Sequence, residues 1–276
     1  MTILKCNIPP SLLAALEAQA ASQKSGISHI VTAALSQYLA TPIHTLFQVS
    51  TSGALVAGFP DGVVTCRKLL EHGDFGLGTF EHLDGEMAVL DGRVYRARGD
   101  GTNVEAADDD AVPFAVVSRF EPEIDLTVPC APSLEALIAI CDTHRTSDNI
   151  FYAIRLDGTF RQVRTRVVTP LADQGGLVDA AKAQSEFSFS DIEGTLVGLW
   201  SPAFSGAVSI PGYHFHFLSS DRRHGGHLLD CAADGLRLRV EALNDFHIAL
   251  PENESFLRAD LSKDTAEDLA YAERSH

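Results

Sequence analysis

Residues 212–217, Gly-Tyr-His-Phe-His-Phe, alternate aromatic side chains with histidines. Side chains on a β-strand point to opposite faces in turn, so this pattern predicts a strand with His214 and His216 on one face and the aromatic rings on the other. A polar, glycine-ended connection follows at residues 219–226, and an apolar run resumes at His227. The pattern therefore predicts a β-hairpin in which His227 lies across from the histidine pair.

Three imidazoles that converge from one hairpin have the composition of a metal site. Neutral imidazole nitrogens suit Zn²⁺, which in catalytic sites keeps a fourth position for water or substrate. Zinc is the first expectation, although imidazole also binds copper, iron and nickel. The alternative is that His214, His216 and His227 are surface or core histidines that only neighbour one another. His224 falls in the predicted loop and is left out of the site.

Composition limits the classes of protein to which this chain can belong. Its 276 residues suffice for one large core or two smaller ones, and a formal net charge of −16 argues against a nucleic-acid surface over most of the chain. No apolar run is long enough to span a bilayer and no signal peptide is recognisable, so we expect no membrane partner and a cytoplasmic location. The five cysteines are scattered, with no Cys-x-x-Cys pair, which predicts reduced thiols.

Residues 1–44 differ in pattern from the rest of the chain. Residues 4–8 alternate like a short strand, and two helical patterns follow, the first opened by Pro9-Pro10 and the second by Ser28. This order resembles a ribbon-helix-helix module, a dimeric fold in which paired strands often bind DNA. Because the segment has few basic residues for phosphate contacts, we expect it to form a homodimer, with nucleic-acid binding as the less favoured use.

Most of the remaining sequence is typical of strands and turns. Asp91-Gly92 predicts a hairpin turn after a strand at residues 84–90, and parity puts Glu86 on the same face as Ala88. A carboxylate on a core face needs a partner or a function. A position at the exposed edge of the strand is the alternative for Glu86.

Residues 151–167 predict a second hairpin, with Asp157-Gly158 as its turn. Arg164 and Arg166 share a face there. Together with Arg155 and Arg161 they are expected to form a locally positive surface in an acidic chain. An arginine binds a carboxylate through a planar, bidentate fork. A solvated basic strand edge is the alternative.

Three further segments carry local structural signals. The apolar run at residues 54–58 predicts a strand. Ser133 predicts the N-cap of a helix that continues to Asp142. A last helix is expected from Asp264 to near Glu273.

Three stretches together resemble the α-acetolactate decarboxylase family. One is the histidine hairpin at residues 211–227. The second, residues 72–86, runs from His-Gly-Asp-Phe-Gly-Leu-Gly-Thr-Phe to Leu-Asp-Gly-Glu, and the third, residues 151–166, contains Phe-Tyr-Ala-Ile, Asp-Gly-Thr-Phe and Arg-Thr-Arg. The motifs follow one another in the family's order, and the resemblance covers residues 46–273. Residues 1–44 are a departure from the family's pattern.

The resemblance implies a zinc lyase that converts a small-molecule substrate, (S)-2-acetolactate, into (R)-acetoin and CO₂ through a metal-stabilised enediolate. It implies that the zinc ligands are His214, His216 and His227. The family's site carboxylate falls on Glu86, and its site arginine falls on Arg166.

The resemblance also implies a glutamate near the C-terminus that reaches back to the site. Glu273 is the best match, with Glu252 and Glu254 as competitors. In the mechanism that we expect, Arg166 binds the substrate carboxylate or stabilises charge near it. Glu86 or Glu273 delivers the proton to one face of the enediolate.

The expected fold is α+β and mostly β. Residues 45–276 are expected to form two packed β-rich parts, of mixed-sheet or barrel-like character, with a few helices. Residues 1–44 precede them as a small strand-helix-helix module. Two other functions stay open: a histidine-rich iron oxygenase, and an acetolactate-sensing or DNA-binding regulator built on a non-catalytic decarboxylase-like domain.

Overall fold

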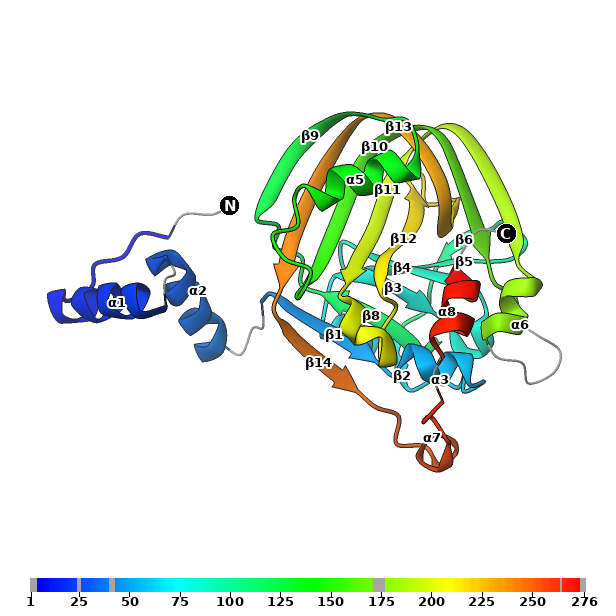
Figure 1. Cartoon of the computed structure of the whole chain (residues 1–276), viewed down its shortest axis with the longest axis horizontal. Coiled ribbons are helices and arrows are strands. Elements are labelled where there is room, and N and C mark those ends of the chain that lie inside the picture. Colours follow the sequence, from blue (N-terminus) through cyan, green and yellow to red (C-terminus); the bar gives the residue numbers. More distant parts are fainter. Residues whose placement is uncertain (1–3, 24–25, 40–42, 171–176, 264, 274–276) are drawn as a thin grey trace. The chain divides into compact units, whose positions relative to one another are not determined.

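The chain forms two compact units, Met1–Ile43 and His44–His276, which are described separately. Figure 1 shows the elements of a computed structural model of the protein. The structure describes residues 4–23, 26–39, 43–170, 177–263 and 265–273.

The smaller unit contains two helices, α1 (Pro10–Gln23) and α2 (Ile27–Tyr38), which contact each other. The strand predicted at residues 4–8 is wrong for the single chain, because residues 4–9 form no strand. A strand needs a hydrogen-bonded partner, and none of the described strands pairs with this segment. The resemblance to a ribbon-helix-helix module is therefore not confirmed.

The first sheet of the larger unit has seven strands. Only the β14–β1 pair is parallel, and the other neighbours are antiparallel. In spatial order the strands are β14 (Asp245–Ala249), β1 (Thr45–Val49), β8 (Phe114–Ser118), β3 (Phe75–Thr79), β4 (Glu86–Leu90), β5 (Arg93–Ala97) and β6 (Asn103–Glu105).

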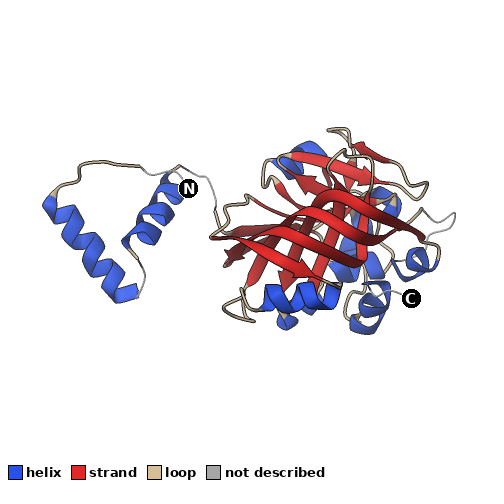
Figure 2. Ribbon diagram, turned by 90° about the horizontal axis from the view of Figure 1, so that it is seen from above, coloured by secondary structure: helices blue, strands red, loops and turns tan. Residues whose placement is uncertain are grey.

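The second sheet is built from longer, antiparallel strands that curve over the first sheet (Figures 1 and 2). Its order is β10 (Phe151–Val167), β11 (Ser185–Ser201), β12 (Gly212–Ser219), β13 (Gly225–Leu243) and β9 (Ile124–Ala131). Because β10 also pairs with β13, four of these strands close on themselves. The short strands β2 (Val64–Thr65) and β7 (Ala111–Val112) form a separate pair. The predicted mostly β fold with packed sheets is confirmed.

Helices are few and short in this unit. They are α3 (Ser52–Val56), α4 (Cys66–Leu70), α5 (Leu134–Asp142), α6 (Leu177–Lys182), α7 (Glu254–Arg258) and α8 (Ala266–Glu273), with 3-10 turns at Glu81–Leu83 and Ala203–Ala207. Helix α5 packs against the second sheet, whereas α3, α6 and α8 contact one another (Figure 1). None of the described helices is long and apolar enough to cross a membrane.

One buried apolar cluster fills the space between the two sheets. It joins Leu77 and Ala88 of the first sheet to Val197 and Leu218 of the second. Met87, which points the other way along β4, belongs to a different cluster on the far side of the first sheet. The face predicted for Glu86 is therefore the face that meets the second sheet.

The predicted hairpin about Asp157-Gly158 is wrong, because β10 continues through it as one strand. Both residues keep their partners on β11, and Asp157 also pairs with β13. The Asp157 carboxylate accepts a hydrogen bond from Thr195 at 2.9 Å and pairs with Arg239. Long-range pairing on both sides of the strand overrides the local turn signal.

Residues 54–58 were predicted to form a strand, and this is also wrong. Residues 52–56 are helix α3, and the Thr51 hydroxyl caps it by accepting a hydrogen bond from the Ala54 N–H at 3.1 Å. A threonine at this position favours a helix start. The predicted Ser133 cap is confirmed, since the Ser133 hydroxyl accepts from the N–H of Ala136 at the start of α5.

A buried ion pair fixes the start of the larger unit to the second sheet. His44 Nδ1 lies 3.1 Å from Glu241 Oε1, and the Glu241 side chain is fully buried. Hydrogen bonding to Glu241 raises the pKa of His44 above its ordinary value of 6.5, and burial raises the pKa of Glu241. Both groups bind protons more tightly when folded. The stability due to His44 is therefore fully present below pH 6.5 and is lost as pH rises through its folded pKa.

We expect His44→Asn to lower the free energy of unfolding by about 1–3 kcal/mol, because it leaves the Glu241 carboxylate without its partner. Asparagine also tolerates the positive φ of 53° at this position. Thermal melts followed by circular dichroism should show a deficit in Tm that is larger near pH ~6 than near pH ~9. His247→Asn, at an exposed position, is the control. A deficit that does not change with pH would contradict the assignment.

Candidate metal centre and active site

Strands β12 and β13 bring three histidines together. In their register His216 pairs with His227, and His214 lies on the same face as His216. His214 Nε2 is 3.1 Å from His216 Nε2 and 3.1 Å from His227 Nδ1. All three side chains are buried, and one nitrogen from each lies within 4.8 Å of the others. The convergence expected from the sequence is present.

A backbone carbonyl of the first sheet orients one of these imidazoles. His216 Nδ1 lies 2.6 Å from the carbonyl oxygen of Met87 in β4. A carbonyl oxygen can only accept, so Nδ1 carries the proton and donates it. His216 Nε2 is then the unprotonated nitrogen, and its lone pair faces His214. A hydrogen bond of this kind on the second ring nitrogen is typical of histidines that bind metals.

The three imidazoles are neutral near pH 7. Burial, with the positive charge of Arg166 as a smaller cause, lowers the pKa of His214 to about 3. Burial is also the main cause that lowers the pKa of His216 and the pKa of His227 well below the ordinary value. Neutral imidazoles are the form that binds a metal.

The spacing of these nitrogens suits one shared ion. Two nitrogens bound tetrahedrally to Zn²⁺ at about 2.0–2.1 Å lie roughly 3.3 Å apart. The observed separations of 3.1 Å from His214 Nε2 to each of the other two ligand atoms are close to that value. The histidines therefore fit a metal ion by donor type, by protonation and by the two separations from His214, although the same donors do not distinguish zinc from other transition metals.

Arg166 and Glu86 lie beside the histidines. Arg166, near the end of β10, is 2% exposed, and its Nη1 lies 3.5 Å from Glu86 Oε1. Glu86, the first residue of β4, also lies 3.5 Å from His216 Nε2 and accepts a hydrogen bond from the Val168 N–H at 3.4 Å. Burial raises the pKa of Glu86 to about 7 against the opposing effect of Arg166, and Glu273 raises it further.

Helix α8 supplies the second carboxyl group. Glu273 Oε2 lies 3.6 Å from His214 Nε2, 3.6 Å from His227 Nδ1 and 3.8 Å from Arg166 Nη2. Burial raises the pKa of Glu273 as well. Glu252 and Glu254, its competitors in the sequence, are exposed. The structure therefore brings Glu273 to the cluster.

These groups enclose a small cavity between the sheets. It measures about 30 Å³, and its polar lining includes Glu86, Arg166, His214, His227 and Glu273. The rest of the wall is largely apolar. A compact site of this kind holds charged groups in a dry environment, where they interact strongly.

Sequence reasoning missed two supporting features of the site. The Met87 carbonyl is one, since backbone acceptors leave no signal in the sequence. Thr79 is the other: it lines the cavity and donates a hydrogen bond to the Gly85 carbonyl at 2.8 Å. Gly85 has a φ of +103°, and a Cβ there would meet the Ala97 carbonyl at 2.3 Å. Only glycine suits the turn that leads into Glu86.

The other candidates lie away from the cluster. Arg164 pairs with Glu186 and Arg161 pairs with Asp234, so these arginines do not form a substrate surface with Arg166. His224 was not included in the predicted metal site because it falls in the hairpin loop, and its ring packs against that of Phe189.

Buried imidazoles beside an arginine and two carboxyl groups, between packed sheets, have the composition of an enzyme active site that can hold a metal ion. A sequence model of the family described as alpha-acetolactate decarboxylase matches residues 46–263. This chain belongs to the α-acetolactate decarboxylase family.

Relatives match over most of the larger unit. The α-acetolactate decarboxylase of Bacillus licheniformis is 38% identical over 231 residues, which cover 83% of this chain and 91% of the relative. That of Lactococcus lactis subsp. lactis is 36% identical over 222 residues, covering 80% and 94%. The crystal structure of the enzyme from Bacillus subtilis strain 168 matches with a TM-score of 0.81 at 33% identity, covering 84% of this chain and 100% of that chain.

We expect His216→Ala to lose the metal, because the two remaining imidazoles are too few ligands to hold the ion tightly. After dialysis against Zn²⁺ and then metal-free buffer, the parent chain should keep about one ion and the variant close to none. Elemental analysis by mass spectrometry measures the content. His224→Ala, outside the cluster, should bind as the parent does. Equal zinc content in both variants would contradict the site.

Proposed function

We propose that this protein is a zinc-dependent carboxy-lyase that converts (S)-2-acetolactate into (R)-acetoin and CO₂. Membership of the decarboxylase family supports the reaction. The observation that carries the residue roles is a cluster of three neutral imidazoles next to a small cavity that His214 and His227 line together with one arginine and two carboxyl groups.

His214, His216 and His227 would hold the zinc ion. When bound, zinc supplies a Lewis acid that stabilises negative charge on the substrate's oxygens as CO₂ departs. The bond from His216 Nδ1 to the Met87 carbonyl supports this role, since it keeps Nε2 free for the metal. The remaining steps belong to the side chains of the chain itself.

The substrate's own ketone lies β to its carboxylate. When the carbon–carbon bond to CO₂ breaks, its electron pair forms the double bond of an enediolate, and the ketone oxygen takes the negative charge. Addition of one proton to the carbon that lost CO₂ gives acetoin. The reaction consumes one proton and needs no organic cofactor.

Arg166 is proposed to bind and orient the substrate carboxylate. Among the described residues, its Nε and Nη1 atoms have no hydrogen-bond partner although both are buried. Buried N–H groups without a hydrogen bond are costly, and an oxygen of the substrate carboxylate would accept one from either of these atoms. The side chain is almost fully buried at the end of β10, so the guanidinium is held in place before substrate arrives.

Either carboxyl group is placed to deliver the proton. Glu86 approaches from the first sheet and Glu273 from α8, so they flank the cavity from different elements. A proton delivered from one fixed side sets a single handedness in the product. The effects of Glu86→Gln and Glu273→Gln on kcat and on the handedness of acetoin identify which of the two is the donor.

Replacement of the donor by its amide should lower kcat for acetoin formation about 10²–10⁴-fold and erode the preference for (R)-acetoin, because glutamine cannot supply the proton. Replacement of the other carboxyl group should change KM more than kcat. We would assay Glu86→Gln and Glu273→Gln on racemic acetolactate with chiral chromatography of the product. Glu254→Gln, on an exposed helix, is the control. Wild-type kcat and stereochemistry in both site variants would contradict the proposal.

We further propose that the N-terminal module, predicted at residues 1–44 and observed as the unit Met1–Ile43, mediates homodimerisation, and that the unit from His44 onward is the catalytic domain. None of the described residues of this segment belongs to one of the three buried apolar clusters. Eight of its large apolar side chains are exposed: Leu4, Ile8, Leu12, Leu13, Ile27, Leu35, Tyr38 and Leu39. A second copy suits such a surface, because few charges oppose self-association, whereas nucleic acid needs a basic surface.

Leu12→Glu combined with Leu35→Glu should convert a dimer into a monomer with unchanged specific activity, because charges would be buried without partners. Light scattering after size-exclusion chromatography gives the mass. Leu250→Glu combined with Leu257→Glu, at exposed leucines of the larger unit, should leave the mass unchanged. The same mass for both double variants would contradict the module's role.

A further inference from the structure

Strands β12 and β13 part immediately beyond the metal centre. They pair at Leu218–Gly225, Phe217–Gly226 and His216–His227, and at no later position. Residues 212–215 of β12 continue along β11 alone, whereas Leu228 of β13 pairs with β10. The closed arrangement of the second sheet therefore has an opening between β12 and β13 on the far side of these three pairs.

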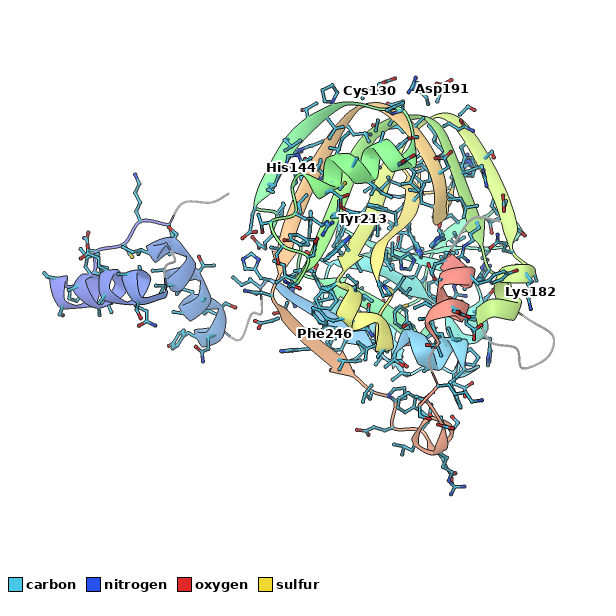
Figure 3. The ribbon with its side chains drawn as sticks, in the orientation of Figure 1. Cys130, His144, Lys182, Asp191, Tyr213 and Phe246 are labelled. Atoms are coloured by element: carbon cyan, nitrogen blue, oxygen red, sulfur yellow. The ribbon has the colours of Figure 1, made fainter. Side chains whose placement is uncertain are left out.

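A second cavity, of about 320 Å³, lies at this opening. Tyr213 and Phe215 line it from β12, and Leu228 and Leu229 from β13. Helix α5 contributes Leu134 and Ile138, and Figure 3 labels Tyr213 beneath this helix. The cavity is large enough for a small-molecule ligand, since ligand pockets begin at about 300 Å³.

The two cavities meet at two site residues. His227 and Glu273 are the residues that line both of them. Glu273 is also the most exposed side chain of the site, at 16%, whereas those of Arg166 and His216 are 2% and 1% exposed. One of the two shared residues is thus the site side chain that solvent reaches most.

The rim of the larger cavity is held in place by a polar network. The Tyr213 hydroxyl donates a hydrogen bond to Asp142 at 2.8 Å and accepts one from Arg145 Nε at 2.9 Å. The Arg145 guanidinium lies 3.7 Å from the ring centre of Trp200. These contacts tie the end of α5 to β12, so the opening keeps its shape without substrate.

We propose that 2-acetolactate reaches the metal centre through the opening between β12 and β13, with Ile138 at its outer rim and Glu273 at its inner end. The larger cavity has roughly ten times the volume of the smaller one, about 320 Å³ against about 30 Å³, so it offers a substrate molecule room to approach the metal centre. The inference rests on the proposed function for the identity of the ligand. The passage itself rests on strand register and cavity lining.

Two substitutions of the same type on α5 test the passage. Ile138 lines the cavity, whereas Ile140, also half-buried, packs on the apolar cluster of the second sheet. We expect Ile138→Trp to lower kcat/KM for acetolactate about tenfold at unchanged zinc content, and Ile140→Trp to leave it unchanged. Ile138→Ala, which widens the rim, should retain or raise kcat/KM and covers the case in which the tryptophan variant fails to fold.

A second readout does not depend on catalysis. The rate at which dipicolinate removes zinc from the loaded protein should fall severalfold in Ile138→Trp, rise in Ile138→Ala and stay constant in Ile140→Trp. A parent chain that forms no acetoin would contradict the proposed function, yet these rates would still report on the passage. Equal removal rates and equal kcat/KM in Ile138→Trp and the parent chain would overturn it.

Discussion

The hydrogen bond from His216 Nδ1 to the Met87 carbonyl connects the two sheets at the centre of the site. Met87 belongs to β4 of the first sheet, and His216 belongs to β12 of the second. The bond fixes which imidazole nitrogen carries the proton, so that the other faces His214 and His227. It also sets the distance between β4 and β12, which places Glu86, the neighbour of Met87, beside the same imidazole.

Burial between the sheets gives the site its electrostatic character. Removal from water keeps the imidazoles neutral and favours the protonated forms of Glu86 and Glu273. Arg166 is the fixed positive charge in contact with both carboxyl groups; it opposes the effect of burial on these groups but helps to keep the imidazoles neutral. The result is a dry cluster with metal-binding nitrogens, an anion-binding fork and acidic groups within a few ångströms of one another. That combination matches a reaction in which an anionic substrate loses CO₂ and gains a proton.

Much of the site could be predicted because the alternation of side chains along a strand determines which of its residues share a face. Alternation placed His214 and His216 on one face, the hairpin signal placed His227 opposite, and parity turned Glu86 toward the second sheet. Arg166 and Glu273 needed the resemblance to the family, because no local pattern distinguishes Arg166 from its neighbouring arginines. Nor does any pattern show that a helix some 45 residues after the hairpin returns to it.

Two of the wrong predictions have one physical cause in common. Asp157-Gly158 has the composition of a turn, yet pairing to strands on both sides keeps β10 continuous. Residues 4–8 have the alternation of a strand, yet a strand cannot form without a partner. In both places the outcome depends on contacts with distant segments or other chains, which a local pattern does not contain.

The most direct test of the account is acetoin formation from acetolactate by the purified protein, measured before chelation, after removal of metal and after zinc is restored. The account predicts loss of activity on chelation and recovery when zinc returns, with the fold unchanged by circular dichroism. Full activity in a folded, metal-free chain would contradict the central claim that the three histidines act through a bound metal ion.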